Sequence, residues 1–191
     1  MSNQKIGFIG LGSLGEGLCN SLVTAGYPVT VNDLNKSLAT RLLAAGATWA
    51  DTTADACKDA DVVITVLPSP AVSRKVVEGP GGVFDNLKAG GTWIEMSTTD
   101  QHEIERIASL AAARGIATLE APVTGGVHRA AAGEITAPAA GFCAELVCVI
   151  ATNARPTTQH TTFLRTNIPG TSAQRVFSEP SQGIRIASSQ A

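Results

Sequence analysis

KIGFIGLGSLGEGLCNSLVTAGYPVTVND, the stretch at residues 5–33, contains two short apolar segments with a helical segment between them. The first apolar segment runs into a glycine-rich turn. Leu14, Leu18 and Leu22 then recur at the spacing of one helix face, and Gly26 follows as a helix terminator. The second apolar segment, PVTVND, begins directly after it. The stretch therefore predicts two parallel strands joined by a helix, which is the unit of an α/β fold.

The glycine-rich turn has the spacing G-x-G-x-x-G at residues 10–15. In this pattern Gly10 permits a tight turn, Gly12 lets a pyrophosphate approach the backbone, and Gly15 lets helix and strand pack closely. The start of the helix adds N–H groups and partial positive charge. Because the turn follows a strand and opens a helix, we expect a dinucleotide site rather than a turn without a ligand. The predicted cofactor residues in this stretch are Gly10, Leu11, Gly12, Ser13, Leu14, Gly15 and Asp33.

Asp33, at the end of the second strand, indicates which dinucleotide binds. A carboxylate accepts hydrogen bonds from the ribose 2′-hydroxyl of NAD and repels the 2′-phosphate of NADP. No arginine adjoins it, since Leu34 comes next and Lys36 lies further on. We therefore expect NAD, with NADP less favoured. The alternative is that Asp33 only caps the following helix.

Strands and helices continue to alternate along the chain. The pattern predicts a Rossmann-type, doubly wound and mainly parallel α/β sheet. Beyond residue 136 the alternation ends, so we expect a dinucleotide-binding domain over 1–136 and an atypical, poorly structured tail over 137–191. The predicted strands are 5–10, 28–33, 47–51, 61–68, 91–97 and 116–122, and the predicted helices are 13–26, 35–46, 52–60, 71–79 and 101–115.

Composition excludes several classes of partner. A net charge of −2 gives no reason to expect nucleic acid. No apolar run approaches the roughly 20 residues that a membrane helix needs. The four cysteines lack metal-ligand spacing, so we expect no metal site and reduced thiols in a cytoplasmic protein. Because the first predicted strand begins at residue 5, we also expect no leader peptide.

Four motifs in order, GFIGLGSLGEGL, VLPSP, IEMSTTD and EAPVTGGVHRAAAGEIT, resemble the β-hydroxyacid dehydrogenases. That family includes 3-hydroxyisobutyrate dehydrogenase and its tartronate semialdehyde, threonate and 6-phosphogluconate relatives. The resemblance covers residues 5 to about 136. It implies hydride transfer between a small 3-hydroxy acid and NAD, in a protein that forms homo-oligomers.

The resemblance also implies roles for individual residues. Leu67 and Pro68 would flank the adenosine, and Thr98 would lie near the nicotinamide. Ser97 would hold the substrate carboxylate together with Thr124, Gly125 and Gly126. Each assignment has a structural alternative. Leu67 and Pro68 could simply end a buried strand, and residues 125–126 could simply form a turn. One of residues 97–99 could be the N-cap of the following helix, with Glu103 completing a capping box. His128 and Arg129 are not assigned.

The chain departs from the family in its catalytic group. The family carries a catalytic lysine in an all-helical second domain, whereas this chain has no lysine after Lys88. We therefore assign no catalytic residue. A truncation, a frameshift or a faulty gene model would each explain the loss of the family pattern after Thr136. Two functions stay open: the cofactor domain of a 3-hydroxyacid dehydrogenase, inactive by itself, or a non-catalytic NAD-binding fragment or regulatory module.

Overall fold

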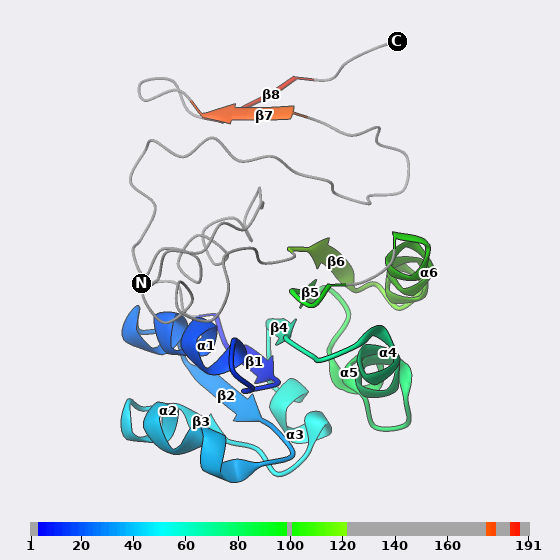
Figure 1. Cartoon of the computed structure of the whole chain (residues 1–191). Coiled ribbons are helices and arrows are strands. Elements are labelled where there is room, and N and C mark those ends of the chain that lie inside the picture. Colours follow the sequence, from blue (N-terminus) through cyan, green and yellow to red (C-terminus); the bar gives the residue numbers. More distant parts are fainter. Residues whose placement is uncertain (1–3, 99–100, 122–174, 179–183, 188–191) are drawn as a thin grey trace.

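The computed structural model describes residues 4–98, 101–121, 175–178 and 184–187. Its centre is a six-stranded, all-parallel sheet in the order β3-β2-β1-β4-β5-β6 (Figure 1). The strands are β1 (Ile6–Ile9), β2 (Val29–Asn32), β3 (Thr48–Trp49), β4 (Val62–Thr65), β5 (Thr92–Glu95) and β6 (Ala117–Glu120). This strand order is that of the doubly wound dinucleotide-binding fold, so the predicted fold class is confirmed.

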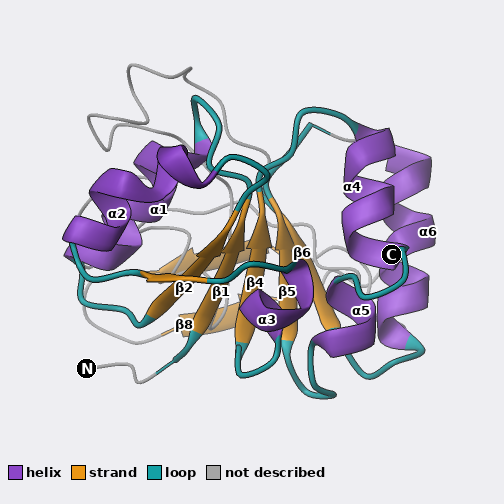
Figure 2. Cartoon of the chain, turned by 90° about the horizontal axis from the view of Figure 1, so that it is seen from below, coloured by secondary structure: helices purple, strands orange, loops and turns teal. Residues whose placement is uncertain are grey.

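Helices cover both faces of the sheet, as Figure 2 shows. The helical segments are α1 (Gly15–Thr24), the 3₁₀ turn η1 (Lys36–Ala39), α2 (Thr40–Ala44), α3 (Thr53–Cys57), α4 (Pro70–Glu78), α5 (Val83–Asn86) and α6 (Gln101–Ala112). Leu18 and Leu22 of α1 pack with Phe8 and Ile64 in one core. On the opposite face Trp93 packs with residues of α3 to α6 in a second core. Two layers of core explain why the central strand β4 is buried along its whole length.

Two short elements differ from the predictions. The helix predicted at 35–46 divides into η1 and α2, and α5 was not predicted at all. Both are too short for a helical period to be visible in the sequence. Near the C-terminus, Arg175–Ser178 (β7) pairs antiparallel with Ile184–Ala187 (β8), where we predicted no strand. The remainder of 137–191 lies outside the described residues.

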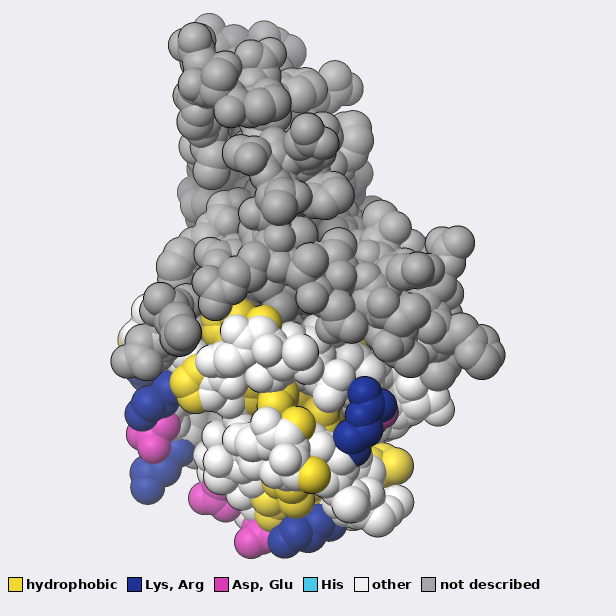
Figure 3. Space-filling view, turned by 90° about the vertical axis from the view of Figure 1, so that its left-hand side faces the viewer, with side chains coloured by type: hydrophobic (Ala, Val, Ile, Leu, Met, Phe, Trp, Pro, Cys, Tyr) yellow, Lys and Arg dark blue, Asp and Glu magenta, His cyan; other side chains and the backbone are white. Residues whose placement is uncertain are grey.

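The described surface mixes charges of both signs. Figure 3 shows basic side chains beside acidic ones on one face, rather than a continuous basic surface. Arg41, for example, lies 3.4 Å from the carboxylate of Glu16. No helix in the described part of the chain is long and apolar enough to cross a membrane.

Candidate dinucleotide-binding site

The carboxyl ends of four neighbouring strands meet at one edge of the sheet. Strand register places Ile9, Asn32, Thr65 and Glu95, the last residues of β1, β2, β4 and β5 respectively, at the same level. The loops that follow these residues surround a cleft of about 680 Å³. Open α/β sheets bind ligands at this edge, and the volume suits a small molecule or cofactor.

The glycine loop forms one wall of the cleft, and its three glycines differ in their surroundings. A Cβ on Gly10 would lie 2.2 Å from the carbonyl oxygen of Val66, and Gly10 has a φ of +97°. A Cβ on Gly15 would lie 2.0 Å from the carbonyl oxygen of Gly10. A Cβ on Gly12 would meet nothing within 4 Å. Packing therefore requires two of the glycines, while the third leaves its backbone open to the cleft.

Asp33 connects the glycine loop to the end of β2. Its Oδ2 accepts a hydrogen bond from the Leu11 N–H at 2.7 Å, and its Oδ1 accepts one from the Asn35 N–H at 2.9 Å. Asp33 does not cap the helical turn that follows it, because the N-cap of η1 is Asn35, whose side chain accepts a hydrogen bond from the Ser37 N–H. Each carboxylate oxygen has a second lone pair, so Asp33 retains acceptor capacity toward the cleft.

The loops after β4 and β5 form the far side of the cleft. The hydroxyl oxygen of Ser97 accepts a hydrogen bond from the Leu67 N–H at 2.7 Å, which fixes one loop on the other. Leu67, Pro68, Ser97 and Thr98 all line the cleft. Helix α4 begins just beyond Pro68, with Ser69 as its N-cap, and contributes Val72, Lys75 and Val76 to the lining.

The structure brings together the predicted residues that it describes, with one exception. Leu11 does not line the cleft; its side chain is fully buried in the core, and only its N–H contributes, through Asp33. Thr124, Gly125 and Gly126 lie outside the described residues. The lining residues predicted from the sequence are Gly10, Gly12, Ser13, Leu14, Gly15, Asp33, Leu67, Pro68, Ser97 and Thr98.

A family model supports the same conclusion. The model for the NAD-binding domain of 6-phosphogluconate dehydrogenase matches residues 5–147. The chain belongs to this family. An NAD-dependent L-serine dehydrogenase of Pseudomonas aeruginosa is 38% identical over 133 residues, which are 70% of this chain and 45% of that protein. The chain thus spans less than half the length of this curated relative.

Solved structures of the family share the fold. The 3-hydroxyisobutyrate dehydrogenase of Mycobacterium tuberculosis with L-serine is 30% identical, with a TM-score of 0.69 over 79% of this chain and 52% of that chain. Psf3 in complex with NADP⁺ and 2-OPP is 29% identical, with a TM-score of 0.72 over 77% of this chain and 55% of that one. The L-serine and 3-hydroxyisobutyrate dehydrogenases among these relatives act on hydroxyl groups; the name of the first specifies NAD, whereas Psf3 is bound to NADP⁺.

The residues of this family member fit a dinucleotide. The open Gly12 backbone, the start of α1 and the Asp33 carboxylate lie on one cleft wall, as a pyrophosphate and an adenosine ribose require. Among the described residues, no group of three or more His, Cys, Asp or Glu side chains gathers to hold a metal ion.

Sequence reasoning missed several residues of the site. Leu34 and Leu38 line the cleft although both side chains are exposed, Leu34 completely. An apolar residue directly after Asp33 in a polar loop was the available signal. Glu95 was also missed: it is fully buried at the end of β5, behind Ser97. A carboxylate inside an apolar strand was the signal there.

Proposed function

We propose that the chain supplies the cofactor-binding half of a dehydrogenase that transfers hydride between a small 3-hydroxy acid and a nicotinamide, with NAD preferred. The names of relatives support the substrate class, because L-serine carries its hydroxyl on the third carbon and appears in two of them. When bound, the nicotinamide ring accepts or returns the hydride. The residues of this chain bind and orient it.

The position of Asp33 is the observation that supports NAD. Its carboxylate lies in the cleft lining at the end of β2, and the N–H groups of Leu11 and Asn35 hold its orientation. A 2′-phosphate about 4 Å from this carboxylate would cost on the order of 4 kcal/mol at intermediate dielectric. Lys36 does not offset that cost, because its ammonium lies 5.3 Å from the centre of the Trp49 ring and outside the lining.

Calorimetric titration of the purified chain with NADH and NADPH tests this preference. NADH should bind at least tenfold more tightly than NADPH. Asp33→Ala should reduce this difference in affinity, because it weakens the binding of NADH and removes the repulsion of the NADPH 2′-phosphate. Asp59→Ala is the matched control, because Asp59 does not line the cleft. Lys75→Ala is titrated in the same way, to measure how much the positive charge of Lys75 in the lining contributes to the affinity for each dinucleotide. Equal affinity of the unaltered chain for both dinucleotides would refute the preference.

The substrate carboxylate is proposed to bind beside Ser97. Ser97 follows β5 at the opposite end of the cleft from Asp33, so a dinucleotide extended from β2 to β5 would place its nicotinamide near Thr98. Ser97 lines the cleft, and its hydroxyl oxygen accepts from the Leu67 N–H at 2.7 Å, which fixes this residue beside the proposed anion site. The proposed partners Thr124, Gly125 and Gly126 would add N–H groups to this anion site.

A second candidate is a cofactor-binding module without turnover. Lys88, the last lysine of the chain, forms an ion pair with Asp61 at 2.5 Å, and Asp61 also accepts from the backbone N–H of Lys5. These residues lie just before β5, β4 and β1, at the amino edge of the sheet, opposite the cleft. Lys88 is therefore not placed to exchange a proton with a substrate hydroxyl. Neither candidate predicts turnover by this chain alone, so titration of the NADH-bound chain with L-serine distinguishes them: binding of the acid supports the dehydrogenase half, and a module without turnover has no need of a substrate carboxylate site.

The proposal extends to organisation and compartment. We place the boundary of the cofactor domain near residue 136, although the family match continues to residue 147. A cytoplasmic location is supported by Cys19 and Cys57, which are buried free thiols.

A further inference from the structure

Glu95 is a fully buried carboxyl group that the proposed chemistry does not use. It ends β5, with Thr65 of β4 as its register partner. The side chains that hydrogen bond to it, Ser73, Ser97 and Thr65, are all uncharged. Burial raises the pKa of the Glu95 carboxyl above its usual range, and the hydrogen bonds oppose that rise. A buried carboxyl destabilises a fold unless it is well hydrogen-bonded, so its place here requires a reason.

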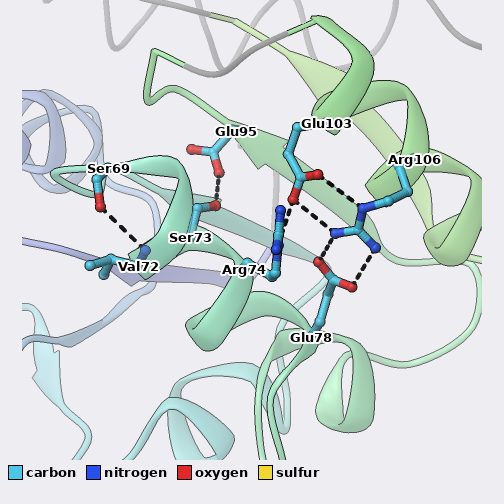
Figure 4. Close-up of polar contacts among 8 residues, drawn as sticks. All are labelled: Ser69, Val72, Ser73, Arg74, Glu78, Glu95, Glu103 and Arg106. Carbon is cyan, nitrogen blue, oxygen red and sulfur yellow. Dashed lines mark hydrogen bonds and ion pairs between the residues drawn. The ribbon is translucent and has the colours of Figure 1, made fainter.

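Glu95 joins three elements through a continuous chain of hydrogen bonds. Its Oε2 contacts the Ser73 hydroxyl on α4, as Figure 4 shows. Its Oε1 accepts from the Ser97 N–H at 2.9 Å, and the Ser97 hydroxyl oxygen accepts from the Leu67 N–H at 2.7 Å. The carboxyl group therefore links α4 to the loop after β5, and through Ser97 to the loop after β4.

The linked elements contribute residues to the cleft lining, whereas the Glu95 and Ser73 side chains that join them do not. Leu67, Ser97 and Val72 line the cleft, but Ser73 and Glu95 are absent from the lining. Glu95 thus lies behind the cleft wall. Buried networks in which every polar atom has a partner hold their elements rigidly, and binding geometry depends on such support.

A second set of contacts holds α4 from outside. Arg74 and Glu78 of α4 pair with Glu103 and Arg106 of α6, at distances of 2.5–2.8 Å (Figure 4). Their side chains are 13–59% exposed, and exposed ion pairs of this kind contribute little to stability. The link through Glu95 is therefore a buried polar contact that fixes α4 relative to the loops, in addition to the apolar packing of Val77.

We propose that Glu95 is a positioning residue of the cofactor cleft, which holds α4 and the loops after β4 and β5 in the arrangement that binds the dinucleotide. The inference rests on the proposed cofactor function. Glutamine has the same shape: its carboxamide oxygen accepts from Ser97, and its amide donates to Ser73. Alanine leaves both groups without a partner.

The experiment compares Glu95→Ala, Glu95→Gln and Glu120→Ala in the full chain. Glu120 is the matched control, because it is the register partner of Glu95 on β6 and does not line the cleft. Two quantities are measured where circular dichroism shows each variant folded: the affinity for NADH, and the hydrogen-exchange rate of the Leu67 amide. The exchange rate needs no ligand, so it tests Glu95 even if NADH does not bind and the proposed function fails.

Glu95→Ala should lower the affinity for NADH at least tenfold and accelerate exchange of the Leu67 amide at least tenfold. Glu95→Gln should restore both to within about threefold, and Glu120→Ala should change neither. Unchanged exchange and affinity in Glu95→Ala would overturn the proposal, as would a glutamine variant as defective as alanine. If Glu95→Ala does not fold, Ser73→Ala takes its place, since it removes the contact to α4 and leaves β5 intact. Unaltered NADH affinity in that variant would then refute the proposal.

Discussion

Replacing Gly12 by alanine should abolish most cofactor affinity without disturbing the fold. An added Cβ meets no atom within 4 Å, and the φ of Gly12 is outside the left-handed region. At such a position the change from glycine to alanine stabilises a protein by about 0.4–1 kcal/mol, through the unfolded chain. The thermal midpoint of Gly12→Ala should therefore equal or slightly exceed that of the unaltered protein.

The same methyl group occupies the space through which a pyrophosphate reaches the backbone. Each hydrogen bond from an N–H group to a charged oxygen contributes about 1.5–3 kcal/mol. Losing one of them lowers affinity by about tenfold to a hundredfold, because about 1.4 kcal/mol corresponds to a factor of ten. Titration of NADH by fluorescence, with thermal unfolding of the same samples, measures both effects.

Gly15→Ala is the contrasting variant. Its Cβ would lie 2.0 Å from the carbonyl oxygen of Gly10, which is backbone and cannot turn aside. The helix α1 must then move away from the loop, and overpacking of this kind costs about 1–3 kcal/mol. Relative to the unaltered protein, Gly15→Ala should have a lower thermal midpoint, whereas the midpoint of Gly12→Ala should be equal or slightly higher. The reasoning is refuted if Gly12→Ala binds NADH as tightly as the unaltered chain, or if it unfolds as readily as Gly15→Ala.

Two further predictions concern turnover and pH. The chain mixed with NAD and either L-serine or 3-hydroxyisobutyrate should produce no NADH absorbance, because the lysine that the family resemblance implies for uptake of the hydroxyl proton has no counterpart after Lys88. Turnover that is lost in His128→Ala, or in a variant of the lining lysine, Lys75→Ala, would contradict this. Hydrogen bonds from Arg106 and Arg74 lower the pKa of Glu103 from 4.5 to about 2. Its stabilising contribution is thus complete above pH 4.5 and is lost as the pH falls toward 2, so Glu103→Gln should flatten the pH dependence of the thermal midpoint in that window; an unchanged slope would contradict it.

The sequence alone was sufficient for the fold and for one wall of the site. Gly10 and Gly15 are needed where strand, turn and helix follow one another along the chain, so their spacing is visible without a structure. Asp33 was found for the same reason, since the end of β2 is a local feature. The strand segments were predicted because apolar runs between glycine-rich turns are also local.

Tertiary structure alone decided the rest of the site. Leu34 and Val72 come from loops and helices far apart in sequence, and only strand order places them around one cleft. The partner of Asp33 proved to be the Leu11 N–H rather than a following helix, which depends on the approach of β1 and β2. Glu95 is hydrogen-bonded to Ser73, which lies 22 positions away in the sequence, and to Ser97, which lies two positions away. No periodic sequence pattern encodes such pairs. Local patterns reflect the backbone preferences of neighbouring residues, whereas these contacts arise only when the sheet has formed and its carboxyl edge brings the loops together.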